Sequence, residues 1–135
     1  MSNFKETQCD KLVQQIACLG ISQWSGYPAQ CGHHIIGRTN LLWRWRLLNI
    51  APLTTEEHQM LHAGLLDGLA DWQKQFKYDN RNKLLVSYLV KSGMTRDEFV
   101  AERLTYLRQV KDDIEHGRTT WDDVIQKERE QYGTI

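Results

Sequence analysis

Four of the five histidines in this chain of 135 residues lie between positions 33 and 62. His33 and His34 are adjacent, whereas His58 and His62 are four residues apart. Side chains four residues apart on an α-helix lie one above the other on the same face. If this stretch is helical, His58 and His62 can hold one metal ion between them, as the histidines of an H-E-x-x-H motif do. The glutamate of that motif is missing here, so a metalloprotease is not supported.

The residues before His58 predict where that helix begins. Thr54 can accept a hydrogen bond from a backbone N–H, and Glu57 three residues later can bond back to Thr54. This is the spacing of a capping box, which marks a helix N-terminus. Apolar residues continue the same helical face, so we expect the helix to run from Thr55 to Lys77.

The adjacent histidines need a different explanation. They follow a Gly-Tyr-Pro turn, and the run from Ala29 to Ile36 is typical of a short strand. Neighbouring side chains of a strand point to opposite faces, so His33 and His34 cannot share one role. One of them can turn to a metal ion while the other turns to a substrate.

Positions 41–48 alternate apolar and basic residues after the first two positions. One interpretation is a second strand that pairs with the first, with Trp43 and Trp45 on one face. Arg44 and Arg46 would then lie on the other face, towards phosphates. The tryptophans would pack in the core or, as a sharper hypothesis, stack on unpaired bases. A short helix is the alternative to this strand.

In their order and spacing, these polar residues resemble the HNH, or ββα-metal, endonucleases. The resemblance is to the histidine-rich form found in the DNase domains of bacterial colicins and in phage recombination-type HNH proteins. That form has an adjacent histidine pair, an asparagine about half-way, and two histidines one helical turn apart. The matching residues here are His33, His34, Asn49, His58 and His62. The Asn-Ile-Ala-Pro-Leu run that begins at Asn49 also resembles the family's run before its helix.

The resemblance implies hydrolysis of DNA phosphodiester bonds with one divalent metal ion. His33, His58 and His62 would hold this ion, which is expected to be zinc, nickel, manganese or magnesium. Imidazole nitrogens favour the transition metals in affinity. His34 would be the general base, because an imidazole with an ordinary pKa of about 6.5 is largely neutral at pH 7. Asn49 would brace the loop that orients this base.

Many HNH proteins also carry two Cys-x-x-Cys knuckles that bind a structural zinc ion. The second knuckle usually lies just before the helical histidine, and no cysteine lies there in this chain. Cys18 and Cys31 are too far apart in sequence to form such a knuckle. We therefore expect no structural zinc site.

The formal net charge of the chain is zero, but the charges are unevenly distributed. Arg38, Arg44 and Arg46 lie between positions 33 and 50 with no acidic residue among them. Phosphate binding requires local positive charge rather than a positive total. We expect these three arginines to contact nucleic acid, and the alternative is that they are ordinary surface charges.

Together these features predict an α+β fold, with a small ββα-metal hairpin-helix core and mostly helical additions at both ends. We expect residues 1–78 to form the nuclease core with an N-terminal helix at 4–19. Residues 79–135 would form a helical extension that packs on this core in one compact domain. Its helices are predicted at 81–92, from the Thr95–Glu98 capping box to the residues before Gly117, and at 120–132.

The remaining features bear on location and on the fifth histidine. The chain has no apolar run long enough to cross a bilayer, and its N-terminus lacks the apolar region of a signal peptide. Three cysteines without paired spacing suit a reducing compartment. We therefore expect a cytoplasmic protein, in the bacterial host cytoplasm if it is phage-encoded, with DNA as its partner in recombination or repair. His116 is expected to be structural, near a helix C-terminus.

Two other interpretations remain open. In the first, a metal ion ties the hairpin to the helix in a DNA-binding or regulatory module that cleaves nothing, so that His34→Ala changes no activity. In the second, no metal binds, and the chain is an interaction protein built on its C-terminal helices. That second interpretation predicts that metal ions leave the melting temperature unchanged.

Overall fold

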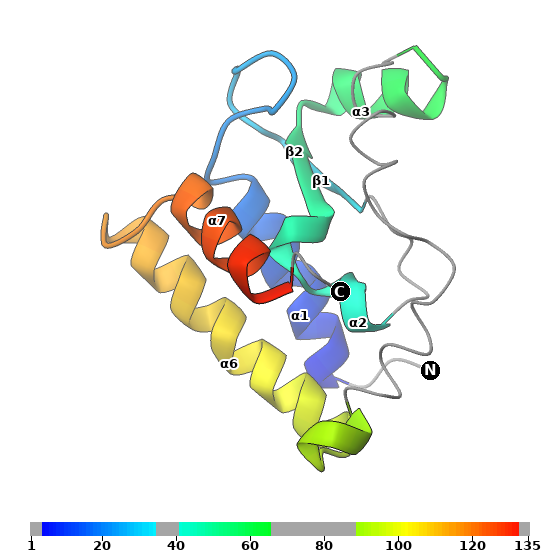
Figure 1. Ribbon diagram of the computed structural model, residues 1–135. Coiled ribbons are helices and arrows are strands. Elements are labelled where there is room, and N and C mark those ends of the chain that lie inside the picture. The colour runs from blue at the N-terminus through cyan, green and yellow to red at the C-terminus, as the bar shows by residue number, and fades with distance from the viewer. Residues whose placement is uncertain (1–3, 35–40, 66–88, 133–135) are drawn as a thin grey trace.

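The computed structural model describes residues 4–34, 41–65 and 89–132 of the chain (Figure 1). These residues form helices and one two-stranded antiparallel hairpin, which agrees with the expected α+β class. The elements in order are α1 (Phe4–Ala17), β1 (Cys31–His34), α2 (Leu41–Arg44), the 3₁₀ helix η1 (Leu47–Asn49), β2 (Ile50–Leu53), α3 (Thr55–His62), α6 (Arg96–Glu115) and α7 (Trp121–Tyr132). The predicted boundary at residue 78 lies outside the described residues.

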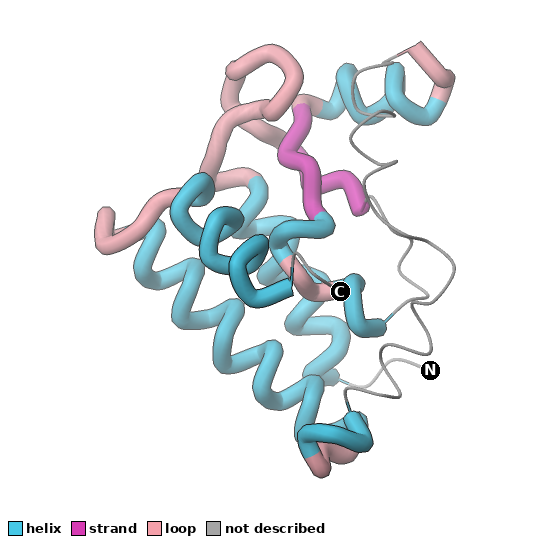
Figure 2. The backbone as a smooth tube through the Cα atoms, viewed as in Figure 1, coloured by secondary structure: helices cyan, strands magenta, loops and turns pink. Residues whose placement is uncertain are grey.

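The hydrophobic core lies between α1 and α6, which run side by side (Figures 1 and 2). Apolar residues recur at helical spacing in both helices, and this gives each of them a stripe that it can bury. Val13 and Ile16 of α1 and Leu107 of α6 have no exposed surface. Burying one such side chain contributes about 1.5–3 kcal/mol. The predicted N-terminal helix at 4–19 is confirmed, and it ends at Ala17.

Local signals also predict the helix ends of the C-terminal region correctly. Thr95 and Glu98 form a capping box, in which each side chain accepts a hydrogen bond from the backbone N–H of the other residue. Residues 89–92 are helical and are followed by a turn at Gly93. A second turn at Gly117 separates α6 from α7. The part of the predicted helix at 81–88 lies outside the described residues.

The predicted second strand at positions 41–48 is wrong. The alternative holds for its first half, which is the short helix α2, and the strand that pairs with β1 is β2. The reason is that Trp43 and the residues from 45 to 48 are all buried, with Leu47 and Leu48 only 0% and 5% exposed. Adjacent residues of a strand face opposite sides, so a strand could not place Leu47 and Leu48 in the same core.

A close approach of α1 fixes the position of the hairpin. Gly32 of β1 pairs with Pro52 of β2, and proline has no N–H to donate. The N–H and C=O of Gly32 are bound by the side-chain amide of Gln14 instead, at 2.8 and 2.9 Å. A Cβ added to Gly32 would lie 3.0 Å from the Cβ of Ala17 in α1 and 2.7 Å from the Cγ2 atom of Ile50. Glycine at this position therefore lets α1 hold the strand that carries the adjacent histidines.

Helix α3 begins where predicted and ends earlier. The Thr54 hydroxyl accepts from the Glu57 N–H, and the Glu57 carboxylate accepts from the Thr54 N–H, so the capping box is confirmed. Gly64 adopts a φ of +76°, and the N–H groups of Gly64 and of the next residue bond back to carbonyls of the last turn. One continuous helix to Lys77 is therefore wrong, because α3 ends at His62. Residues 66–77 lie outside the described residues.

Candidate metal centre

Three histidine rings meet where β1 lies against α3. The ring centroids of His33 and His58 are 5.2 Å apart, those of His33 and His62 are 5.5 Å apart, and those of His58 and His62 are 4.6 Å apart. Each ring offers one nitrogen, and these three nitrogens lie within 4.8 Å of one another. A tetrahedral zinc ion with Zn–N bonds of about 2.0–2.1 Å places its ligand nitrogens about 3.3 Å apart. The three residues can therefore hold a metal ion.

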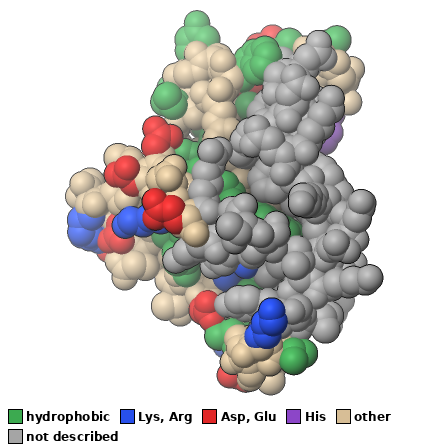
Figure 3. Space-filling view, viewed as in Figure 1, with side chains coloured by type: hydrophobic (Ala, Val, Ile, Leu, Met, Phe, Trp, Pro, Cys, Tyr) green, Lys and Arg blue, Asp and Glu red, His purple; other side chains and the backbone are tan. Residues whose placement is uncertain are grey.

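Local structure explains why the rings converge. The i, i+4 spacing on α3 brings the Nε2 atoms of His58 and His62 to 3.1 Å. The capping box starts α3 directly after β2, and β2 pairs with the strand that carries His33. Histidine surface is visible at the edge of the molecule below α3 (Figure 3). His62 is exposed, so a metal ion can reach this position from solvent.

The surroundings of His33 and His58 favour the neutral forms of these two rings. Burial lowers the pKa of His33 to about 4, with further lowering by the charges of His58, His62 and His34. The pKa of His58 is also lowered, first by burial and then by the charge of His62. A neutral imidazole keeps a lone pair for a metal ion, whereas a protonated one does not. At neutral pH the unprotonated ring nitrogens of His33 and His58 can therefore act as metal ligands.

His34 lies on the opposite face of β1 from His33, as the strand prediction requires. Its Nε2 atom lies 2.9 Å from the carbonyl oxygen of Arg44. A carbonyl oxygen only accepts hydrogen bonds, so Nε2 carries the proton and donates. The lone pair of the neutral ring is then on Nδ1. The backbone at Arg44 thus sets which nitrogen of His34 can act as a base.

Three consecutive carbonyls of this loop, those of residues 43 to 45, accept hydrogen bonds from side chains. The Asn49 side-chain amide donates to the carbonyl of Trp43 at 3.1 Å, and Asn49 has no exposed surface. His34 binds the next carbonyl, and Arg103 of α6 donates to the carbonyl of Trp45 at 2.8 Å. Asn49 therefore braces the loop that orients His34.

A buried carboxylate from α7 holds the same loop at its other end. Glu128, which is 1% exposed, accepts hydrogen bonds from the N–H groups of Leu47 and Leu48 at the start of η1. It also accepts from the Tyr106 hydroxyl at 2.9 Å. Sequence reasoning singled out neither Glu128 nor Arg103. The signal that could have found them is a charged residue at an apolar position of an amphipathic helix, since Arg103 lies within the buried stripe of α6.

Two of the arginines that were predicted to contact phosphates have other partners in the structure. Arg44 binds both carboxylate oxygens of Asp10, at 3.0 and 2.6 Å, and its side chain is 12% exposed. Arg46 is buried and lies over the ring of Trp43, 5.4 Å from the centroid. The predicted strand, which turns both arginines towards phosphates, is therefore wrong. Arg38 lies outside the described residues.

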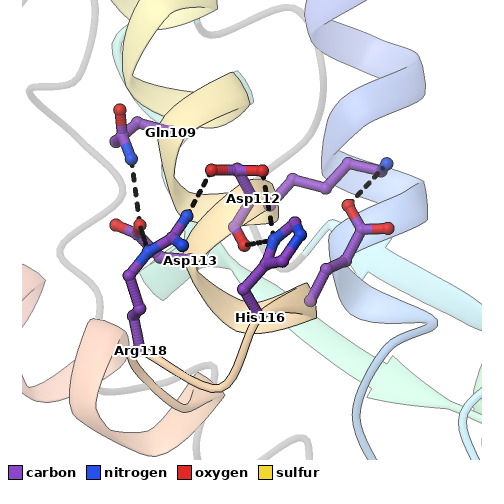
Figure 4. Close-up of polar contacts among 7 residues, drawn as sticks. Gln109, Asp112, Asp113, His116 and Arg118 are labelled. Carbon is purple, nitrogen blue, oxygen red and sulfur yellow. Dashed lines mark hydrogen bonds and ion pairs between the residues drawn. The ribbon is translucent and has the colours of Figure 1, made fainter.

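The fifth histidine belongs to a separate surface cluster at the end of α6 (Figure 4). His116 lies 3.2 Å from a carboxylate oxygen of Asp112, and Arg118 binds both Asp112 and Asp113. Hydrogen bonds from Arg118 and then Gln109 lower the pKa of Asp113. This network fastens the C-terminal turn of α6, as expected for a structural His116.

Comparisons of the chain with models of protein families, with characterised proteins and with solved structures found no match. Within the described residues, no helix has the length and apolar character that a membrane crossing requires.

Proposed function

We propose that this protein is a metal-dependent endonuclease of the HNH type that hydrolyses DNA phosphodiester bonds. One observation carries the proposal: ring nitrogens of three imidazoles from β1 and α3 lie within 4.8 Å of one another, and the residue next to one of them is a fourth histidine oriented by a backbone carbonyl. A metal site alone would need no oriented fourth ring. The combination is that of a cation centre with a neighbouring base.

His34 is the general base in this proposal. Its Nε2–H is held by the Arg44 carbonyl, so Nδ1 is the atom that takes a proton from the attacking water. The water oxygen forms a bond to phosphorus, the bond from phosphorus to the 3′ oxygen breaks, and the leaving oxygen takes up a proton. The products carry a 5′-phosphate and a 3′-hydroxyl. Asn49, Arg103 and Glu128 are positioning residues, because they fix the loop and do not touch the substrate.

His33, His58 and His62 would hold one divalent ion. When bound, this ion stabilises negative charge on the phosphate and on the leaving oxygen. Three imidazole nitrogens favour zinc, nickel or manganese over magnesium in affinity. The burial of His33 serves the same purpose, because a ring that resists protonation remains a ligand in mildly acidic solution.

A non-catalytic module is the second candidate, and one observation favours it. An ion bound by all three rings would join β1 to α3, since His33 lies on β1 and the other two histidines lie on α3. Such an ion could stabilise a DNA-binding or regulatory module without any cleavage. The two candidates differ in the role of His34, which a structural site does not use.

The deciding experiment is nicking of supercoiled plasmid by purified protein with manganese, nickel, zinc or magnesium, and with EDTA. We expect metal-dependent nicking by the wild type, no nicking by His34→Ala, and normal nicking by the matched control His116→Ala. Metal binding by His34→Ala should be retained. Nicking that survives in His34→Ala would reject this base, and wild-type protein that binds metal but nicks nothing would favour the non-catalytic module.

A further inference from the structure

A groove runs between α1 and the strand that carries His34. It has a volume of about 510 Å³ and opens to solvent. It is lined by His34 and by four residues of α1: Asp10, Lys11, Gln14 and Gln15. Because adjacent side chains of a strand face opposite sides, this groove lies on the base side of β1 and not on the side of His33.

Two of the lining side chains have structural partners. Gln14 uses both ends of its amide to bind the backbone of Gly32. Asp10 binds the guanidinium of Arg44 through both oxygens and accepts from the indole N–H of Trp45 at 2.9 Å. The negative charge of Asp10 is therefore balanced by Arg44, and Asp10 contributes little repulsion to an anion in the groove.

The other two α1 side chains are available for a ligand. Lys11 and Gln15 are exposed and lie one helical turn apart on the same face. Among the described residues, no acidic side chain lies within ion-pair distance of the Lys11 ammonium. Because the charges of Asp10 and Arg44 cancel each other, the positive charge of Lys11 remains in the groove, next to the proposed base His34.

We propose that this groove binds the sugar-phosphate backbone of the substrate strand, with Lys11 on a phosphate that neighbours the one at His34. The inference rests on the proposed function, because His34 defines where the scissile phosphate lies. Lysine binds phosphate as a point charge, and an amide such as Gln15 can donate to a phosphate or sugar oxygen. One helical turn spans about 5.4 Å, so Lys11 and Gln15 reach different groups along one strand. In this proposal, side chains of α1 make the contacts with the DNA backbone that the sequence analysis expects from Arg44 and Arg46.

The test compares two charge removals on the same helix. Lys11→Gln removes the positive charge in the groove. Lys5→Gln removes the charge of another exposed lysine, which lies six residues earlier and about 120° around the helix. The probes are a fluorescein-labelled duplex and the corresponding single strand. Binding is measured by fluorescence anisotropy in EDTA, which prevents cleavage, at several salt concentrations. Circular dichroism checks that both variants fold.

Loss of one phosphate contact reduces the slope of log affinity against log salt by about 0.9 for duplex and about 0.7 for single-stranded DNA. Lys11→Gln should therefore bind more weakly than wild type, and this difference should shrink about threefold as salt rises from about 50 to about 200 mM. Lys5→Gln should have the wild-type slope. Equal slopes for the two variants would overturn the groove assignment.

Parallel plasmid nicking separates failure of this inference from failure of the proposed function. If wild type nicks DNA and both variants have the same salt slope, the substrate lies elsewhere and the groove assignment alone is wrong. If wild type neither binds the probes nor nicks plasmid, both the groove assignment and the nuclease are wrong. Gln15→Lys adds a positive charge on the same face of α1 as Lys11. If this variant raises both the DNA affinity and the salt slope, the result supports a DNA strand that lies along α1.

Discussion

Arg103 of α6 donates a hydrogen bond from Nη2 to the carbonyl oxygen of Trp45 at 2.8 Å, beside the carbonyl that binds His34. The Arg103 guanidinium also lies over the ring of Tyr106, 4.5 Å from its centroid, and the side chain is buried. A buried charged donor fixes the peptide that it binds, because an unsatisfied carbonyl costs about 1–3 kcal/mol. The C-terminal helices thus take part in orienting the proposed base.

Arg103→Lys keeps the charge but loses the planar fork of donors. We expect the free energy of unfolding to fall by about 1–3 kcal/mol, as measured by urea denaturation. The freed loop should let the His34 ring adopt both neutral tautomers, which ¹⁵N NMR of the imidazole nitrogens distinguishes. Plasmid nicking should slow while metal binding remains.

The matched control is Arg108→Lys, on the same helix, where the guanidinium donates to Gln8 on the surface. Its stability should stay within about 0.5 kcal/mol of wild type. If Arg103→Lys lowers stability but the His34 ring keeps its wild-type tautomer, Arg103 has a structural role only.

Gly32→Ala tests the contact between α1 and the hairpin. The new Cβ would lie 2.7 Å from Ile50 Cγ2 and 3.0 Å from the Cβ of Ala17, so the packing must shift. Overpacking of this kind costs about 1–3 kcal/mol in the free energy of unfolding. At Gly20 a Cβ would meet its nearest atom at 3.8 Å, so Gly20→Ala is the control and should leave stability nearly unchanged. Equal denaturation midpoints for the two variants would contradict this packing.

The pH dependence of the metal-free protein follows from His33. Its pKa is about 4 in the folded protein and about 6.5 in the unfolded chain, so between these values the unfolded chain binds more protons. Stability from this group is fully present above pH 6.5 and is lost as pH falls towards 4. In EDTA, the urea midpoint should drop between pH 6.5 and 4.5, and His33→Ala should reduce that drop. An identical drop in the variant would show that other groups cause it.

Local signals made much of this fold predictable, because a capping box or a terminal glycine acts through residues close in sequence. Thr54 with Glu57, and Thr95 with Glu98, mark helix starts that the structure confirms. The i, i+4 histidines are equally local. The family resemblance predicts that His33 converges with that pair, and the structure places the three rings together.

Features that depend on distant partners were not predictable in the same way. The stretch at 41–48 forms helical turns because α6 and α7 cover it, and residues such as Glu128 reach it from about eighty positions away. Nothing near Arg46 in sequence indicates that its side chain is buried. The alternation of apolar and basic residues predicts that Arg44 binds phosphate. Its actual partner, Asp10, lies on a different helix and far away in sequence. The alternation of apolar and basic residues could not by itself distinguish an exposed basic strand face from arginines that lie in a buried network of contacts.

The central claim is that three histidine rings share one metal ion. Its most direct test is to titrate the metal-free protein with zinc and to measure the melting temperature, and then the metal content after desalting. We predict one ion per chain and a higher melting temperature for wild type, since saturation at about 100 times the Kd adds about 2.7 kcal/mol of stability. His33→Ala, His58→Ala and His62→Ala should each abolish this gain, while His34→Ala and His116→Ala retain it. Unchanged melting of the wild type, or full stabilisation of the three single variants, would contradict a cation shared by these three rings.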